Sequence, residues 1–159
     1  MCTRLDPFTM TEEGLSAGLW IIGLGPGNLD HMSKKAINIA RGCSNRYLEG
    51  YTAILPPGQE ERLEEFIGSW ERIMRPEVES PDKLLKLAKD FPVALLVVGD
   101  PLQATTHIDL EARCADLGIN FNFIPGITAT ALAISLSGLQ SYRFGRQVTI
   151  PYSYGKYLP

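Results

Sequence analysis

Three loops carry the residues whose types and spacing suit the binding of a small ligand. The first loop reads Gly-Leu-Gly-Pro-Gly-Asn at residues 23–28, the second reads Gly-Asp-Pro-Leu-Gln-Ala-Thr-Thr at 99–106, and the third reads Pro-Gly-Ile-Thr-Ala-Thr at 125–130. Glycines let a ligand approach the backbone, and the N–H groups and small side chains of the third loop leave room for a flat heterocycle. If the three loops meet, they predict a pocket of nucleoside size.

The first loop also resembles part of a nicotinamide or flavin dinucleotide site. Gly23-x-Gly25 opens a strand-loop-helix unit, and Glu49 lies at about the usual distance of the ribose-binding acid. The fingerprint fails at its third glycine, where this chain has Asn28. Pro26 also removes a backbone donor that a pyrophosphate would need. The sequence therefore disfavours a dinucleotide ligand.

Several of these residues have simpler structural interpretations. Asp100 has the right side chain to cap a helix that starts near Thr105. His107 would ordinarily be a partly exposed helix residue, and His31 a loop residue. Without a cluster of Cys, Asp or Glu at ligand spacing around either histidine, we expect no metal site.

The elements that must position the loops alternate between strand and helix. Ser33 is the expected N-cap of the first helix and Gly42 its end, and Ser80 followed by Pro81 is the expected start of a later helix. The apolar run at 93–98 is typical of a central parallel strand covered on both faces. The expected strands are 19–22, 46–48, 93–98, 120–124 and 147–150, and the other expected helices are 59–70, 107–117 and 126–136. This order predicts an α/β fold with an open, mostly parallel sheet flanked by helices, whose ligands bind at the carboxyl ends of the strands.

Composition limits the class of protein. We expect residues 1–18 to form a flexible N-terminal segment and residues 19–159 a single α/β cofactor-binding domain. Hydrophobic residues make up 45% and charged residues 21%, and the net charge of -3 predicts no binding to nucleic acid. No apolar run is long enough to predict a signal peptide or a membrane span. Three widely spaced cysteines favour a reducing compartment, so we expect a cytoplasmic protein.

Four segments of the chain resemble a known enzyme family. They read IIGLGPGN, YLEGYTAIL, VVGDPLQATTHIDL and GLQSYRFGRQVTIPY. Together they are similar to the tetrapyrrole methylase superfamily of S-adenosylmethionine-dependent methyltransferases, and within it to the diphthine synthases. The segment ATTH distinguishes the diphthine synthases from the corrin and porphyrin methylases. The resemblance runs from about Leu19 to the C-terminus.

The resemblance implies a function and a cofactor site. The activity would be methylation, by S-adenosylmethionine, of the amino group of a modified histidine on translation elongation factor 2, in the synthesis of diphthamide. A homodimer is also implied. Nothing identifies a catalytic base. The implied cofactor-binding residues are Gly25, Pro26, Asp100, Gln103, Ala129 and Thr130.

The chain departs from the family in two ways. An acidic residue usually follows the glycines of the first loop closely, whereas here Asn28 precedes Asp30. The family also has a second α/β domain, which would follow Pro159, so this chain corresponds to the N-terminal domain of a two-domain fold. Two alternatives stay open, a corrin or porphyrin methyltransferase and a non-catalytic binding or dimerisation domain.

Overall fold

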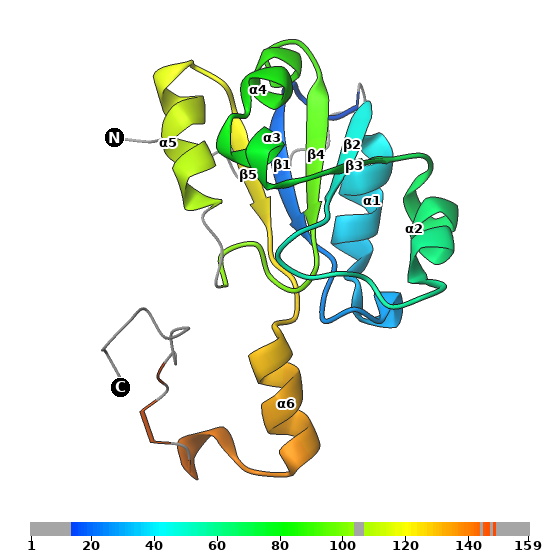
Figure 1. Cartoon of the computed structure of the whole chain (residues 1–159), viewed down its shortest axis with the longest axis vertical. Helices are drawn as coiled ribbons and strands as arrows, with labels where there is room; N and C mark the ends of the chain where they lie inside the picture. Colours follow the sequence, from blue (N-terminus) through cyan, green and yellow to red (C-terminus); the bar gives the residue numbers. More distant parts are fainter. Residues whose placement is uncertain (1–13, 104–106, 144, 147, 149–159) are drawn as a thin grey trace. The chain divides into compact units, whose positions relative to one another are not determined.

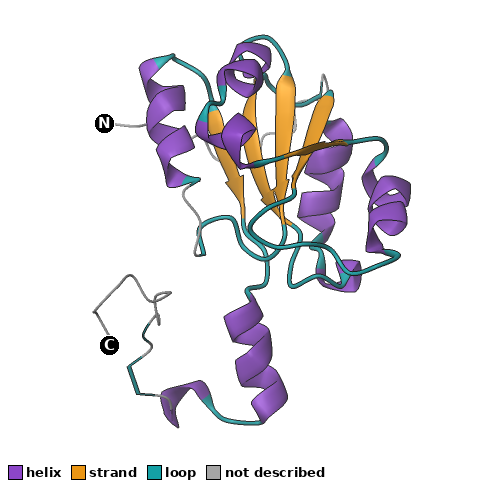
Figure 2. Cartoon of the chain, viewed as in Figure 1, coloured by secondary structure: helices purple, strands orange, loops and turns teal. Residues whose placement is uncertain are grey.

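The chain folds around a parallel β-sheet. The computed structural model describes residues 14–103, 107–143, 145, 146 and 148. The strands are β1 (Gly18–Gly23), β2 (Asn45–Glu49), β3 (Glu71–Ile73), β4 (Pro92–Val97) and β5 (Phe121–Ile124). They form one sheet in the order β3-β2-β4-β1-β5, and each of its four strand pairings is parallel. The predicted α/β class is confirmed. Because every pairing is parallel, the carboxyl ends of all five strands lie along the same edge of the sheet, as the arrows of β1 and β5 show (Figures 1 and 2).

The helices begin and end largely where the sequence predicts them. They are α1 (Lys34–Gly42), α2 (Gln59–Ile67), α3 (Arg75–Glu79), α4 (Asp82–Ala88), α5 (Ile108–Asp116) and α6 (Ala129–Ser137), with short 3-10 helices η1 (Leu29–His31) and η2 (Ser141–Arg143). The Ser33 side chain accepts a hydrogen bond from the backbone N–H of Ala36, 3.1 Å away, and so caps α1 as predicted.

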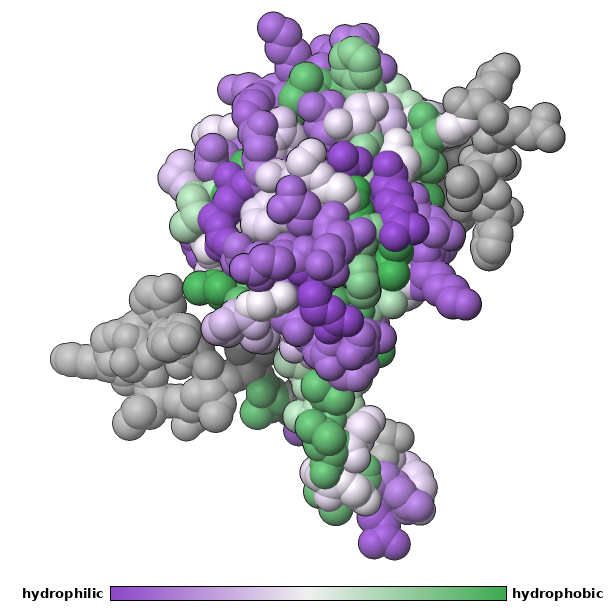
Figure 3. Space-filling view, turned by 90° about the vertical axis from the view of Figure 1, so that its right-hand side faces the viewer, coloured by the Kyte–Doolittle hydropathy of each residue, from purple (hydrophilic) through white to green (hydrophobic). Residues whose placement is uncertain are grey.

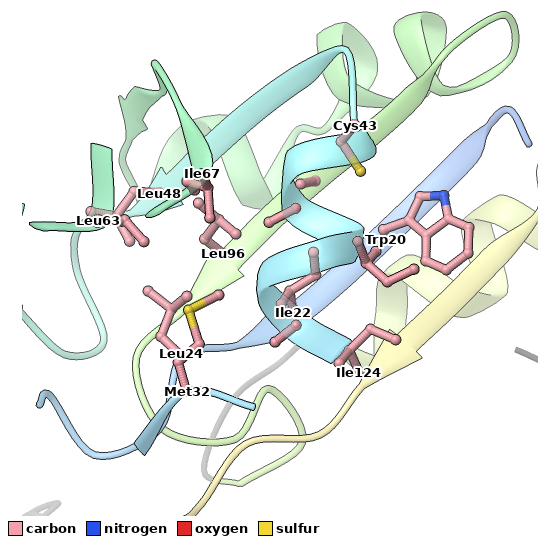
Figure 4. Close-up of a cluster of buried hydrophobic side chains, with 14 of the residues drawn as sticks. Trp20, Ile22, Leu24, Met32, Cys43, Leu48, Leu63, Ile67, Leu96 and Ile124 are labelled. Atoms are coloured by element: carbon pink, nitrogen blue, oxygen red, sulfur yellow. The ribbon is translucent and has the colours of Figure 1, made fainter. Parts of the chain in front are cut away.

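Two layers of apolar side chains cover the two faces of the sheet. Alternate residues of β1 point to opposite faces, so Trp20 and Ile22 join one cluster and Leu19 and Ile21 join the other. Helices α1 and α2 pack on the first face, and α3, α4 and α5 on the second. Figure 4 shows part of the first cluster, with Leu63 and Ile67 of α2 beside strand residues. Burial of each such side chain contributes about 1.5–3 kcal/mol.

Some predicted boundaries were wrong. The predicted helix 59–70 ends at Ile67, because Gly68 adopts a φ of +86° that terminates it. Trp70 directly precedes strand β3, and the sequence analysis did not predict this strand. Ser80 is the C-cap of α3 and not the N-cap of the next helix. Pro81 itself occupies the N-cap position of α4. Most of the predicted strand 147–150 lies outside the described residues.

The chain separates into two compact units, residues 1–129 and 130–159. The first contains the sheet and α1 to α5, and the second contains most of α6. Gly18 is already the first residue of β1, and Leu15 packs against the first apolar cluster. No helix in the described ranges is long and apolar enough to cross a membrane.

Candidate functional site

The first and second loops are joined by their backbones where β1 and β4 end. The N–H of Gly25 donates to the carbonyl of Gly99 at 3.1 Å, and the N–H of Gly99 donates back to the carbonyl of Gly25 at 2.6 Å. Both residues have a positive φ, +79° and +86°, which favours glycine. The pairing of these two glycines therefore fixes the two loops against each other.

The third loop is joined to the second through Asp100. Its Oδ2 accepts a hydrogen bond from the backbone N–H of Gly126 at 3.0 Å, and its Oδ1 accepts one from the backbone N–H of Leu102 at 2.9 Å. A Cβ on Gly126 would lie 2.1 Å from the carbonyl oxygen of Gly99, so only glycine fits there. The three loops that the sequence singled out thus meet at one edge of the sheet.

Four of the predicted cofactor-binding residues lie in these joined loops. Gly25 is buried, while Pro26 and Asp100 are half-buried. Gln103 is exposed, and its backbone N–H donates to the carbonyl of Asp100 at 3.0 Å. The structure therefore brings Gly25 and Asp100 together through Gly99.

The other two predicted residues open α6. Ala129 is exposed and ends the first unit, and Thr130 is exposed and begins the second. The predicted helix start near Thr105 lies outside the described residues. In the described part of the chain, the Asp100 carboxylate accepts hydrogen bonds from the backbone N–H groups of Leu102 and Gly126. Asp100 therefore links the second loop to the third.

The joined loops leave room and acceptor capacity for a ligand. A Cβ built on Gly99 would meet no atom of the described residues within 4 Å, so this part of the structure leaves open space beside the glycine. The carboxylate of Asp100 accepts two backbone hydrogen bonds, and a carboxylate offers about four lone-pair directions. Asp100 can therefore accept further hydrogen bonds from a ligand's hydroxyl or amino groups.

The far end of the first loop is held by polar contacts. The Asn28 side chain accepts a hydrogen bond from the backbone N–H of Asp30 at 3.0 Å and caps η1. At the position where a dinucleotide fingerprint has its third glycine, this chain therefore has a helix-capping residue. The backbone N–H of Leu29 donates to Oε1 of Gln59 at 3.1 Å. The Arg62 guanidinium, 2.6 Å from Asp30, holds the pKa of that carboxyl below its usual value. These contacts fasten the first loop to the start of α2.

A buried Glu-His pair lies at the same edge of the sheet. Oε2 of Glu49, the last residue of β2, is 3.2 Å from Nε2 of His107, and both side chains are at most 1% exposed. Oε1 of Glu49 accepts from the backbone N–H of Thr52 at 2.7 Å, and Nδ1 of His107 lies 3.3 Å from the carbonyl of Pro101. Burial alone would raise the pKa of Glu49, but the hydrogen bonds from His107 and Thr52 outweigh it and keep that pKa below its usual value.

This pair corrects the sequence-based interpretation of both residues. His107 was expected to be partly exposed, yet it is buried because it faces Glu49, which no local pattern relates to it. Glu49 is buried with both oxygens engaged, so it does not present a carboxylate to a ribose as a dinucleotide site requires. Among the described residues, no group of three or more His, Cys, Asp and Glu side chains is arranged to hold a metal ion.

Comparisons with known proteins relate the whole sheet region to one family. The profile of the tetrapyrrole (corrin/porphyrin) methylases matches residues 18–154. The diphthine methyl ester synthase of Homo sapiens is 44% identical over 134 residues, which is 83% of this chain and 46% of that protein. The diphthine synthase of Methanocorpusculum labreanum is 38% identical over 143 residues, 89% of this chain and 57% of that protein.

The fold is shared with solved structures. A crystal structure of diphthine synthase superposes with a TM-score of 0.73 at 34% identity, covering 80% of this chain and 51% of that one. The chain thus spans about half the length of the relatives it matches.

Proposed function

Because this chain belongs to the tetrapyrrole (corrin/porphyrin) methylase family, we propose that it is the cofactor-binding half of an S-adenosylmethionine-dependent diphthine synthase. The observation that carries the proposal is the junction of the three loops, where Gly25 pairs with Gly99 and Asp100 bonds to Gly126. This junction lies at the carboxyl edge of a parallel sheet, where ligands bind in open α/β folds.

The residues at this edge suit S-adenosylmethionine. The proposed contacts are made by Gly25, Pro26, Asp100, Gln103, Ala129 and Thr130. The acceptor capacity of Asp100 suits hydroxyl donors such as those of a ribose, and the open space beside Gly99 lets a ligand approach the backbone. Pro26 offers no N–H, which is no disadvantage for a ligand without a pyrophosphate. When bound, this cofactor supplies a methyl group carried on a sulfonium.

The proposed acceptor is the amino group of the modified histidine of translation elongation factor 2. The amine attacks with its lone pair, so it must be neutral, and its proton passes to a base or to water as the nitrogen–carbon bond forms and the carbon–sulfur bond breaks. We assign no catalytic base. The contribution of this half is to hold the cofactor in line with the acceptor. A protein acting on a translation factor would work in the cytoplasm.

The test is calorimetric titration of S-adenosylhomocysteine into the 159-residue chain and into the full-length protein. Binding by the full-length protein is expected, and binding by the chain alone would place the whole site within these residues. Failure of both to bind would contradict the proposal and favour a non-catalytic binding or dimerisation domain.

A second assay identifies the acceptor. The full-length protein, S-adenosylmethionine and elongation factor 2 bearing the modified histidine are incubated, and mass spectrometry counts the methyl groups gained. The names of the human and archaeal relatives specify different products, a methyl ester and diphthine, so the count also separates these activities. Methylation of a corrin or porphyrin in place of the factor would favour the tetrapyrrole alternative.

We also propose that the protein forms a homodimer. Helix α6 consists mainly of apolar residues, and none of its described side chains is buried. Leu136 is 78% exposed, and Figure 3 shows hydrophobic side chains on the surface of this helix. A helix that is apolar all round normally packs within protein. Sedimentation of the full-length protein is expected to give twice the monomer mass, and a monomer at high concentration would contradict this.

A further inference from the structure

We propose that Glu49 and His107 form a positioning pair for the loop that carries Asp100. The role in cofactor affinity rests on the proposed function, whereas the role in fixing the loop follows from the geometry alone. Neither residue is proposed to touch the substrate or the cofactor. Each acts through the backbone of a neighbouring loop.

The pair connects two loops across the edge of the sheet. Glu49 ends β2, which pairs with β4, and it holds the loop after β2 through the N–H of Thr52 at 2.7 Å. His107 immediately precedes α5, and its Nδ1 faces the carbonyl of Pro101 at 3.3 Å. Pro101 follows Asp100 directly, so a ring fixed at His107 limits where the Asp100 carboxylate can lie. The two loops are therefore coupled through one buried contact.

The partners of the pair determine where its protons are. The carbonyl of Pro101 can only accept, so Nδ1 of His107 must carry a hydrogen. The N–H of Thr52 donates to Oε1 of Glu49. Nε2 and Oε2 would then face each other as two lone pairs at 3.2 Å unless one proton lies between them. Within the described part of the chain neither atom has another partner, so that shared proton is what holds the ring in place.

This arrangement resembles the way a carboxylate orients a histidine elsewhere in enzymes. The shared proton leaves the buried pair neutral overall, which reduces the cost of enclosing a carboxylate. It also keeps the Nδ1–H of the ring directed at the carbonyl of Pro101. Losing the contact with Pro101 would remove an anchor of the Asp100 loop directly, whereas losing the contact with Glu49 would only loosen the side chain that provides this anchor.

Two substitutions separate the two contacts of His107. A glutamine amide nitrogen reaches about as far as Nε2, so His107→Gln can keep the contact with Glu49 and loses the one with Pro101. An asparagine amide nitrogen lies about where Nδ1 does, so His107→Asn can keep Pro101 and leaves Glu49 unpaired. Affinity for S-adenosylhomocysteine and melting temperature are measured for both in the full-length protein.

If the pair positions the Asp100 loop, the two variants should rank in one order by affinity and in the opposite order by melting temperature. We expect His107→Gln to weaken S-adenosylhomocysteine binding about tenfold, as loss of one anchoring hydrogen bond does. We expect His107→Asn to bind more tightly than His107→Gln and to melt at the lower temperature, because it strands a buried carboxylate. Affinities that are unchanged in both, or that fall in parallel with melting temperature, would overturn the inference.

Hydrogen exchange tests the pair independently of the ligand. The N–H groups of Leu102 and Gly126 both donate to Asp100, so we expect them to exchange faster in His107→Gln while amides of β1 stay unchanged. If the wild-type protein binds no S-adenosylhomocysteine, the proposed function fails and the exchange rates alone decide. Equal rates at Leu102 and Gly126 in wild type and His107→Gln would rule out positioning.

Discussion

The carboxylate of Asp100 accepts a hydrogen bond from the backbone N–H of Gly126, 3.0 Å away and 26 residues later in the chain. Asp100 follows β4 and Gly126 follows β5, and β1 lies between these two strands in the sheet. The bond therefore crosses the end of β1, where a Cβ on Gly23 would collide with Gly126 and Gly99. One side chain ties the loops on both sides of β1 and also has lone pairs left for a ligand.

Replacing Asp100 should weaken cofactor binding. Asp100→Ala removes both loop bonds and the acceptor offered to the ligand, so we expect S-adenosylhomocysteine affinity to fall about 10- to 100-fold, as charged hydrogen bonds are worth about 1.5–3 kcal/mol. Asp100→Asn keeps one acceptor oxygen and should lose less. Calorimetry measures both, with the exposed Asp109→Asn on α5 as the control. Wild-type affinity in Asp100→Ala would remove this residue from the site.

Adding a methyl group to Gly126 should destabilise the protein. Its Cβ would lie 2.1 Å from the carbonyl oxygen of Gly99, and the backbone on both sides would have to move. We expect Gly126→Ala to cost about 3 kcal/mol in the free energy of unfolding, measured by urea denaturation. Gly145→Ala is the control, because a Cβ there meets no atom of the described part of the chain within 4 Å. Equal stability of the two variants would show that the loop junction can open to admit a methyl group.

Glu49 should make stability depend on pH in the acid range. Hydrogen bonds from His107 and Thr52 keep the pKa of Glu49 below its usual value despite burial, so the unfolded chain binds this proton more readily. The stabilisation by the carboxylate is therefore complete above about pH 4.3 and is lost as pH falls through the lower, folded-state pKa. Urea unfolding of wild type and Glu49→Gln should differ most near neutral pH.

The matched control for that experiment is Glu64→Gln, an exposed side chain on α2. It should change the free energy of unfolding little across the same range. A stability difference between wild type and Glu49→Gln that grows as the pH is lowered would contradict a depressed pKa for Glu49 in the folded protein.

The two described cysteines should not react in the folded protein. Burial raises the pKa of Cys43 to about 12 and that of Cys114 to about 11, so almost no thiolate forms near neutral pH. Iodoacetamide labelling followed by mass spectrometry should modify neither residue in buffer and both in urea. A Cys2→Ser background keeps the third thiol from interfering. Native labelling of Cys114 faster than global unfolding would show local opening of α5.

Local patterns were sufficient for the elements that are long or have clear ends. The apolar run of β4 was predicted because both of its faces are buried, and α1 because Ser33 caps it. Strand β3 escaped prediction because only Ile73 of its three residues is buried, so no alternation is visible. Helix α3 escaped because its five residues bury only Val78, and its start relies on Glu77 accepting from the N–H of Met74.

The site was predictable only in part, for a physical reason. The three loops were found because parallel strands end at one edge and glycines mark close backbone approach. The contacts between these loops could not be predicted, because the hydrogen bond between Asp100 and Gly126 depends on the order of the strands in the sheet. The buried pair of Glu49 and His107 depends on the same information, since neither residue's neighbours in the sequence mark it as buried.

The strand order also bears on how the chain is made. Among the described strands the first to leave the ribosome is β1, and its two neighbours in the sheet are the last two, β4 and β5. Synthesis runs at about 5–20 residues per second, so the roughly 100 residues between the ends of β1 and β5 take on the order of 5–20 s. Both edges of β1 stay unpaired until β4 has emerged, and the edge that pairs with β5 stays open until the end of the interval. We therefore expect the nascent chain to expose an aggregation-prone strand edge until Ile124 emerges, and a ribosome stalled before that point to prolong this exposure.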